Sequence, residues 1–190
     1  MKTSIRKQEI IKKAEVLFKE KGYSAVTMRD IAQVMGMKAA SLYNHIKSKQ
    51  EILSEIILSL AEEFVAGMDA IVDSNKTAVE KLQDIISLHI SITINHPNGM
   101  ASLNTDWVHL EEQLEYYLKL RDDYEEKFRQ VIISGIENKV ISEVNPEVML
   151  FSVLSTLRSL YLWIPKKEDV NLKDLDADLS QVLLEGVIVK

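Results

Sequence analysis

The residue types that could carry catalysis or hold a metal are few and scattered in this 190-residue chain. It has no cysteine, so a thiol nucleophile, a disulfide and a thiolate metal site are all excluded. Its histidines stand apart, at His45, His89, His96 and His109, without the HExxH spacing that brings two imidazoles onto one helix face. No GxSxG, GxGxxG or phosphate-loop motif occurs. The sequence therefore predicts no enzyme, no metal site and no cofactor.

Basic side chains, in contrast, gather at one end of the chain. Residues 1–50 hold eleven Lys or Arg and four Asp or Glu, a net charge of +7; since the whole chain carries −6, the remainder carries −13. A basic head on an acidic body predicts that only the head binds a polyanion, because phosphate repels the body. The alternative is a basic helix that is simply solvated.

The composition is that of a globular helical protein. Hydrophobic residues make up 46% and charged residues 27%, and only six Gly and three Pro are present. The lack of cysteine fits a reducing compartment. The charged N-terminus lacks the apolar core of a signal peptide, and no uninterrupted apolar run is long enough to span a membrane. We therefore expect a cytoplasmic protein with no membrane association.

The basic head has the pattern of one longer helix followed by two short ones. Apolar residues at steps of three and four predict a helix over residues 5–21, and Gly22 is expected to end it in a left-handed conformation. Thr27 is expected to cap the next helix, with Asp30 completing a capping box. Gly36 interrupts this helix after about two turns.

Helical spacing resumes over residues 37–46, so a tight glycine turn joins two short helices. This is the helix-turn-helix arrangement, whose second helix can enter the major groove of DNA. Ser48 is expected to cap a long fourth helix that leads from the head into the body, with Glu51 at the capping-box position.

The body is predicted to be helical throughout. The β-branched run at residues 90–94 could form a strand, but no second strand is indicated to pair with it, so a helix is preferred. Asn98 and Gly99 are expected to form a loop. The expected helices cover residues 76–96, 105–138 with a bend near Gln113, 146–164 between a cap at Asn145 and a stop at Pro165, and 172–187. The last is expected to start near Leu172 and to bury Leu175, Leu179, Val182, Leu183 and Val187.

The head resembles the tetracycline-repressor (TetR) family of bacterial regulators over residues 5–53. The resemblance implies an all-α chain, with a three-helix helix-turn-helix DNA-binding domain at 1–48 and a helical domain for effector binding and dimerisation at 49–190. It implies a ligand-responsive repressor that a small molecule releases from a palindromic operator. The alternative is a helical protein-interaction module without sequence-specific DNA binding. The residues that carry the resemblance, in family order and spacing, are Ile10, Ala14, Leu17, Phe18, Gly22, Tyr23, Thr27, Ile31, Ala32, Gly36, Leu42, Tyr43, His45, Lys49 and Leu53.

The resemblance also implies DNA contacts at particular positions. Contacts to the phosphate backbone, which orient the protein on the duplex, are expected from Thr27, Tyr43, His45 and Lys49. Arg29 is expected to reach a base, with guanine as its bidentate partner. The face expected to meet base edges consists of Lys38, Ala39, Ala40, Ser41 and Asn44.

Each of these assignments has a structural alternative. Arg29 could form a surface salt bridge, Tyr43 could be a phenol at the edge of the core, and Lys49 could be a solvated amine. The head also departs from the family pattern at two positions. Lys38 stands where a capping serine is common, which leaves one helix amide without a cap, and Ile46 replaces a common phenylalanine of the core.

The two long C-terminal helices, 146–164 and 172–187, are expected to pair with their copies in a second subunit as a four-helix bundle. The first of them is apolar nearly all round, so it needs cover on every side. The alternative is that both are buried within one subunit. A two-fold dimer would place its recognition helices in successive major grooves, which requires a near-palindromic operator.

An effector pocket among the helices after the fourth is also implied by the resemblance. The expected partners are a double-stranded DNA operator, a second copy of the chain, and an effector such as an acyl-coenzyme A thioester or another apolar compound. Cations would meet the phosphates of such a thioester and aromatic rings its acyl chain. The candidate ligand-binding residues, whose alternative is an ordinary core role, are His89, Trp107, Tyr116, Tyr117, Arg121, Phe128, Arg158 and Trp163.

Overall fold

The computed structural model describes residues 2–167 and 174–185, and the side chains from residue 5 onward within those ranges. Every regular element in this part of the chain is a helix, which confirms the all-α prediction. The chain divides into two compact units that alternate along the sequence. Unit 1 comprises residues 1–61 and 96–118, and unit 2 comprises residues 62–95 and 119–190. Unit 1 is therefore larger than the head of residues 1–48.

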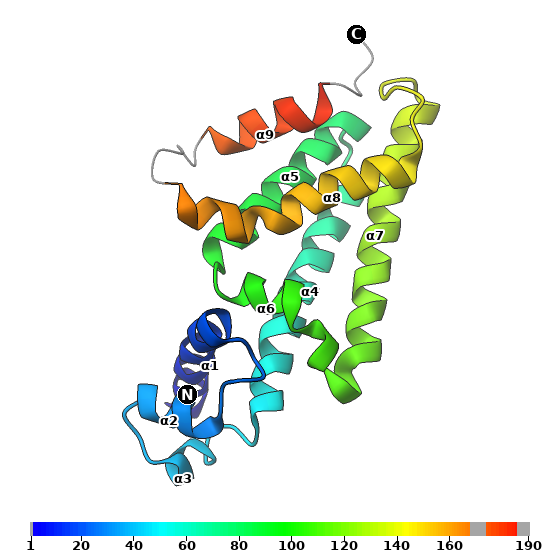
Figure 1. The fold of residues 1–190 in the computed structure, drawn as a ribbon. Coiled ribbons are helices and arrows are strands. Elements are labelled where there is room, and N and C mark those ends of the chain that lie inside the picture. Colours follow the sequence, from blue (N-terminus) through cyan, green and yellow to red (C-terminus); the bar gives the residue numbers. More distant parts are fainter. Residues whose placement is uncertain (1, 168–173, 186–190) are drawn as a thin grey trace. The chain divides into compact units, whose positions relative to one another are not determined.

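Unit 1 is built around α1, which packs against α2 and α6 (Figure 1). Its core contains the fully buried side chains of Ile10, Phe18, Ile31 and Leu42. The elements of this unit are α1 (Lys2–Lys21), α2 (Met28–Val34), α3 (Ala39–Leu42), the first half of α4 (Lys49–Val72), α6 (Gly99–Thr105), the 3₁₀ turns η1 (Trp107–His109) and η2 (Glu111–Gln113), and the start of α7 (Leu114–Glu137).

The turns and caps of the head are as predicted from local sequence. Gly22 has φ +80° and Gly36 has φ +64°, the left-handed conformation that residues with a Cβ rarely adopt. The Thr27 side chain accepts a hydrogen bond from Asp30 N, and the Asp30 side chain accepts one from Thr27 N, so the capping box is complete. These short-range bonds set where α2 starts.

The second helix of the helix-turn-helix is shorter than predicted. Only Ala39–Leu42 is α-helical, and residues 43–45 form a turn. Lys38 stands at the N-cap and makes no side-chain capping bond there, as its residue type predicts. Ile46 N still donates to Leu42 O (3.1 Å) across the turn, and both side chains are buried in the core. The helical spacing of the sequence therefore reflects burial more than helix length.

The loop predicted at Asn98 and Gly99 is wrong in part, because Gly99 starts α6. The missing side chain of Gly99 allows a close approach: a Cβ there would lie 3.0 Å from Leu60 Cδ1. Lys19 Nζ donates to Pro97 O (3.1 Å) and to Asn98 Oδ1 (3.2 Å), which ties α1 to the start of this helix. Local sequence does not reveal a seven-residue helix whose stability comes from such contacts.

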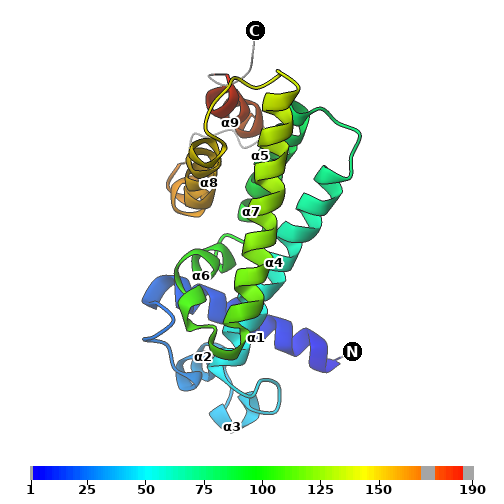
Figure 2. The same ribbon diagram turned by 90° about the vertical axis from the view of Figure 1, so that its right-hand side faces the viewer.

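Unit 2 is a set of helices in which α5 packs against both α8 and α9 (Figures 1 and 2). Residues 90–94 lie within α5, so the helical interpretation of this β-branched run is confirmed. Asn145 caps α8 through a bond from Glu147 N (2.9 Å), as predicted. The elements are the second half of α4, α5 (Ala78–Asn95), the rest of α7, α8 (Pro146–Trp163), the turn η3 (Ile164–Lys166) and α9 (Leu175–Leu184).

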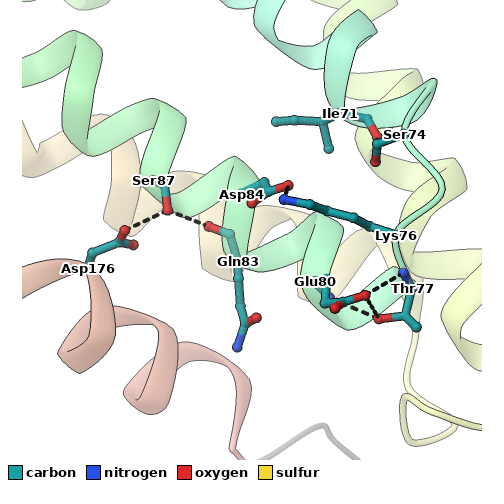
Figure 3. A network of polar contacts seen from close by, with 9 residues as sticks. All are labelled: Ile71, Ser74, Lys76, Thr77, Glu80, Gln83, Asp84, Ser87 and Asp176. Atoms are coloured by element: carbon teal, nitrogen blue, oxygen red, sulfur yellow. Dashed lines mark hydrogen bonds and ion pairs between the residues drawn. The ribbon is translucent and has the colours of Figure 1, made fainter.

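Polar bonds fix both the start of α5 and its contact with α9 (Figure 3). Thr77 and Glu80 form a reciprocal capping pair, with Thr77 N donating to Glu80 Oε2 (2.8 Å) and Glu80 N to Thr77 Oγ1 (3.3 Å). Further along α5, Ser87 Oγ donates to Asp176 Oδ2 in the first turn of α9 (2.6 Å). The cap explains why α5 starts just after Thr77, two residues later than predicted.

The prediction for the last helix is only partly confirmed. Leu175 is buried, and the helix is observed over Leu175–Leu184. Val182, expected in the core, is 78% exposed, and Leu179 and Leu183 are only half-buried, whereas Leu184 is buried. Leu172 and Val187 lie outside the described residues.

Candidate DNA-reading face and effector site

The face predicted to read DNA is exposed around α3 and rests on a buried apolar base. Beneath it, Ile31, Leu42 and Ile46 are buried. Ala39 is half-buried, which brings the backbone of α3 close to the surface. The exposed members of the face are Arg29, Lys38, Ala40, Ser41, Tyr43 and Asn44.

Two of the predicted DNA contacts have side chains free to meet a partner. The Tyr43 ring is 53% exposed, so it is not covered by the core. Arg29 is exposed, and within the described residues no hydrogen bond or ion pair engages it. The salt bridge considered as the alternative for Arg29 is therefore not formed in this part of the chain.

Thr27, in contrast, uses its hydroxyl within the protein. Its Oγ1 donates to Asp30 Oδ2 (2.6 Å) and accepts from Asp30 N (3.2 Å). The hydroxyl bond and the backbone bond from Thr27 both lower the pKa of Asp30. Since a hydroxyl has a single proton, it can donate to a DNA phosphate only by releasing the carboxylate.

Lys49 also has most of its donors engaged. Its Nζ donates to Tyr23 O and Val26 O, both at 2.8 Å, and lies 4.2 Å from the centroid of the Tyr23 ring. Burial lowers the pKa of Lys49. An ammonium has three protons, so one remains for a phosphate. The amine is therefore partly buried and bonded, in contrast to the solvated amine of the alternative.

His45 is half-buried at the end of the turn that follows α3. Its Nδ1 is buried without a hydrogen-bond partner among the described residues. Backbone contact to DNA through this side chain stays a prediction.

In unit 2, His89 lies in a buried aromatic cluster. The ring is 3% exposed, its Nε2 is 2.8 Å from the Tyr124 hydroxyl, and its centroid is 4.6 Å from that of Phe64. Burial, and then the charge of Arg158, lower the pKa of His89 to about 3, so the imidazole is neutral at neutral pH. Burial also raises the pKa of the Tyr124 phenol. The pair is thus an uncharged hydrogen-bonding unit in an apolar setting.

Two polar atoms on this side of α5 have no partner among the described residues. They are His89 Nδ1 and the hydroxyl of Thr93, one helical turn further on, and both side chains are almost completely buried. A buried polar group without a hydrogen bond destabilises the fold by roughly 1–3 kcal/mol. Two such atoms at adjacent positions therefore suit a bound polar group.

Charged residues of α7 and α8 meet at Glu125 in the same unit. Arg158 Nη2 donates to Glu125 Oε1 (2.6 Å), and Arg121 Nε donates to the same oxygen (3.0 Å). Burial raises the pKa of Glu125, but the hydrogen bonds from the two arginines outweigh it and lower the pKa. Two cations thus share one carboxylate.

The eight predicted ligand-binding residues do not all lie in one unit. His89, Arg121, Phe128 and Arg158 belong to unit 2. Trp163 belongs to it as well, but it is 41% exposed at the end of α8. Three others belong to unit 1, where the Trp107 and Tyr117 rings pack with centroids 5.9 Å apart and Tyr116 is 44% exposed.

Comparison with known proteins connects both parts of the chain to one family. Residues 75–187 match the tetracyclin repressor-like, C-terminal domain, and residues 10–56 match the bacterial regulatory proteins of the tetR family. The chain belongs to the tetracycline-repressor family. The resemblance predicted from the head is thereby confirmed and extends to the body of the regulator.

Individual relatives agree with this assignment. The regulator is 29% identical, over 134 residues, to the HTH-type transcriptional repressor KstR2 of Mycobacterium tuberculosis (strain H37Rv), covering 70% of this chain and 67% of that one. The solved structure of the ketosteroid transcriptional regulator KstR2 of M. tuberculosis superposes with a TM-score of 0.90 at 22% identity, covering 97% and 96% of the two chains. AibR in complex with isovaleryl coenzyme A and operator DNA superposes with a TM-score of 0.80 at 21% identity, covering 94% and 98%.

Sequence reasoning about the regulator missed three residues of the buried cluster: Phe64, Thr93 and Tyr124. A signal was available for two of them. Thr93 follows His89 by four residues, and Tyr124 lies four residues before Phe128, so each shares a helix face with a residue already singled out. The Phe64 contact joins α4 to α5, which no local spacing predicts.

The outer face of α8 and α9 is apolar and uncovered. Val148 is 61% exposed, Phe151 72%, Leu162 51% and Val182 78%. Residues Pro146–Lys166 are also long and apolar enough to cross a membrane by length and composition alone, although core helices of soluble proteins pass the same test. Exposed apolar faces of this kind are typical of surfaces that contact another molecule.

Proposed function

We propose that this regulator is a homodimeric transcriptional repressor that binds a near-palindromic DNA operator and is released by a small molecule. Membership in the family supports ligand-responsive repression. The observation that carries the proposal is the exposed face of α3, which presents small and polar side chains on a buried base in a segment of net charge +7. We propose a cytoplasmic location, because the DNA that a regulator of this family binds lies there. A protein-interaction module without DNA binding needs no such face.

The DNA contacts divide into positioning and reading groups. Tyr43, the remaining proton of Lys49 and the amides at the start of α4 bind phosphates and orient the protein. Ala39 and Ala40 allow α3 to approach a thymine methyl group closely, while Asn44 suits adenine and Arg29 suits guanine. Thr27 acts through its cap, by holding α2 under α3.

Selection of random duplexes by the purified protein, followed by sequencing, tests this proposal. We expect a near-palindromic consensus, because two recognition helices related by a two-fold axis read two half-sites. A consensus without internal symmetry would contradict the dimeric mode of reading. Failure to enrich any duplex at low salt would contradict DNA binding itself.

We assign the outer face of α8 and α9 to a second copy of the chain. A membrane is the other candidate for so apolar a surface, but it does not suit Glu147 and Arg158, which lie on the same helix. A second copy would cover the exposed apolar residues of this face together, since a two-fold contact brings the same face against itself.

The effector is assigned to unit 2, beside His89 and Thr93. His89 Nδ1 and the Thr93 hydroxyl, which have no partner within residues 2–167 and 174–185, supply hydrogen bonds, and the surrounding rings supply apolar contact. Because His89 is neutral, this end of the ligand carries no full charge, whereas Arg121 and Arg158 offer charge for an anionic end. An apolar compound with a polar group and a negatively charged extension, such as an acyl-coenzyme A thioester, meets these conditions. AibR, which shares the fold, binds isovaleryl coenzyme A.

Isovaleryl coenzyme A, longer acyl thioesters and free coenzyme A can be titrated into a preformed complex with the selected duplex. We expect one thioester to release the DNA and free coenzyme A to have no effect. Linkage requires DNA to weaken thioester binding by the same factor. His89→Phe should abolish the response while leaving DNA binding intact. Release by every thioester and by free coenzyme A alike would contradict the assigned site.

A further inference from the structure

Tyr23, in the turn between α1 and α2, is held by contacts from several segments of unit 1. Its ring stacks on that of His109 in η1, with centroids 5.3 Å apart and planes inclined by 28°. The Phe18 ring meets it edge-on at 5.2 Å, and Lys49 Nζ lies 4.2 Å from its centroid. The Tyr23 hydroxyl donates to Gln50 Oε1 (2.7 Å). One aromatic ring thus joins α1, α4 and η1.

The backbone of His109 belongs to the same network. Gln50 Nε2 donates to His109 O (2.6 Å), so a single amide group bridges the Tyr23 phenol and the η1 carbonyl. This network, the junction cluster, consists of Tyr23, Lys49, Gln50 and His109.

The junction cluster holds the turn that directs the helix-turn-helix. Lys49 bonds the carbonyls of Tyr23 and Val26, so it closes both ends of this turn. Thr27, the cap of α2, is the next residue. Residues 23–27 form no helix of their own, so together with the bond from Val26 N to Tyr23 O (3.3 Å) these side-chain contacts hold the turn from which α2 starts.

The segment that carries His109 is backbone-strained. Glu111, the first residue of η2, has φ 48°, a conformation uncommon for residues with a side chain. Its neighbour Leu110 is fully buried, which anchors the segment in place. Such strain persists only where surrounding contacts hold it.

We propose that His109 is a positioning residue for DNA reading: its ring, stacked on Tyr23, sets the turn before α2 and hence the presentation of α3. This rests on the proposed function in DNA binding. The segment continues directly into α7 at Leu114, so a displacement at the start of α7 moves His109 and changes its contact with Tyr23.

The test uses the full-length protein, the duplex that it selects and a scrambled duplex of equal length. His109→Ala removes the ring and keeps the carbonyl that Gln50 binds. We expect affinity for the selected duplex to fall by roughly two- to tenfold, the range for loss of an aromatic contact. Affinity for the scrambled duplex should stay unchanged, because it depends on the basic surface and not on the direction of α3.

Two further variants separate positioning from general damage. His109→Phe keeps a stacking ring and should restore selective binding. Val108→Ala, at an adjacent side chain that is 54% exposed, is the matched control and should behave as the wild type. If His109→Ala melts below the assay temperature, His109→Leu gives the same comparison, since it removes the aromatic stack on Tyr23 and still fills most of the space of the ring.

Equal weakening of both duplexes, unchanged binding of the selected duplex, or failure of His109→Phe to restore selectivity would each overturn the positioning role while leaving DNA binding established. A wild-type protein that selects no duplex would instead contradict the proposed function, and the positioning role with it.

Discussion

Single side chains in the head differ in whether their polar atoms are already bonded. The hydroxyl proton of Thr27 goes to Asp30, and two donors of Lys49 go to carbonyls, whereas Tyr43 and Arg29 face solvent. The resemblance to the family predicts that all four of these side chains contact DNA. Their bonding shows that two of them first build the surface that the others present.

The buried imidazole of His89 predicts how stability depends on pH. Its folded pKa of about 3 lies below the ordinary value of 6.5, so the unfolded chain binds more protons between these values. The part of the folding stability that depends on a neutral His89 is therefore fully present above pH 6.5 and is lost as the pH falls below that value. We expect the free energy of unfolding to decrease by about 2 kcal/mol more from pH 7 to pH 5 in the wild type than in His89→Gln. Urea unfolding at both pH values measures this, and parallel behaviour of the two proteins would contradict it.

The capping box predicts a large effect of a single hydroxyl on a short helix. α2 has only seven residues, so the bonds between Thr27 and Asp30 hold a large share of its structure. Thr27→Ala should lower the free energy of unfolding by about 1 kcal/mol, and Thr27→Ser should retain most of it. Thermal unfolding followed by circular dichroism compares them. Equal losses in both variants would show that the methyl group, and not the cap, stabilises α2.

Whole elements of this protein are decided by what covers them. α6 starts at Gly99, where a loop was predicted, because Gly99 allows close packing on α4 and Lys19 bonds the preceding carbonyl. α8 shows the opposite situation, because its apolar side chains Val148, Phe151 and Leu162 are exposed. Residues 99–102 of α6 are buried, so the two helices differ in how far other segments cover them.

The uncovered face of α8 predicts that one charge separates the subunits. Phe151 is 72% exposed, and Phe151→Asp would place a carboxylate against its own copy in a two-fold contact. We expect the molar mass from light scattering to fall from that of two chains to that of one, with helix content retained. Val108→Asp adds the same charge at an exposed position of unit 1 and should leave the mass unchanged. A wild-type protein that is already a single chain would contradict the assignment of this face.

The whole molecule combines a net charge of +7 in residues 1–50 with −13 in the remainder. This asymmetry restricts contact with DNA to the head, because the remainder is repelled by phosphate. Each phosphate neutralised releases counterions, so binding must weaken as salt is added.

Raising the salt concentration fourfold should therefore weaken binding to the selected duplex by roughly 100-fold or more, as is typical when several phosphates are contacted. Fluorescence anisotropy with a labelled duplex measures this. An affinity that does not change with salt would exclude phosphate as the main partner.

Tyr43→Phe should reduce affinity for all duplexes alike, because the phenol contacts the DNA backbone.

Much of the candidate site could be predicted from sequence because its determinants are local. The left-handed glycines, the capping boxes and the cap of α8 each depend on residues at most a few positions apart. The exposed face of α3 also depends on residues close together in the sequence. The family could be identified from the pattern of residues in this segment.

Only the tertiary structure decided which polar atoms pair. Gln50 and His109 are 59 residues apart, and His89 and Tyr124 are 35 apart, so no local pattern indicates either contact. The same holds for α6, whose helix depends on packing partners. Local sequence determines backbone preferences and which faces are apolar. The bonds that engage Lys49 form only when distant segments come together, and so does the packing that buries His89 Nδ1 without a partner in the part of the chain that the structure describes.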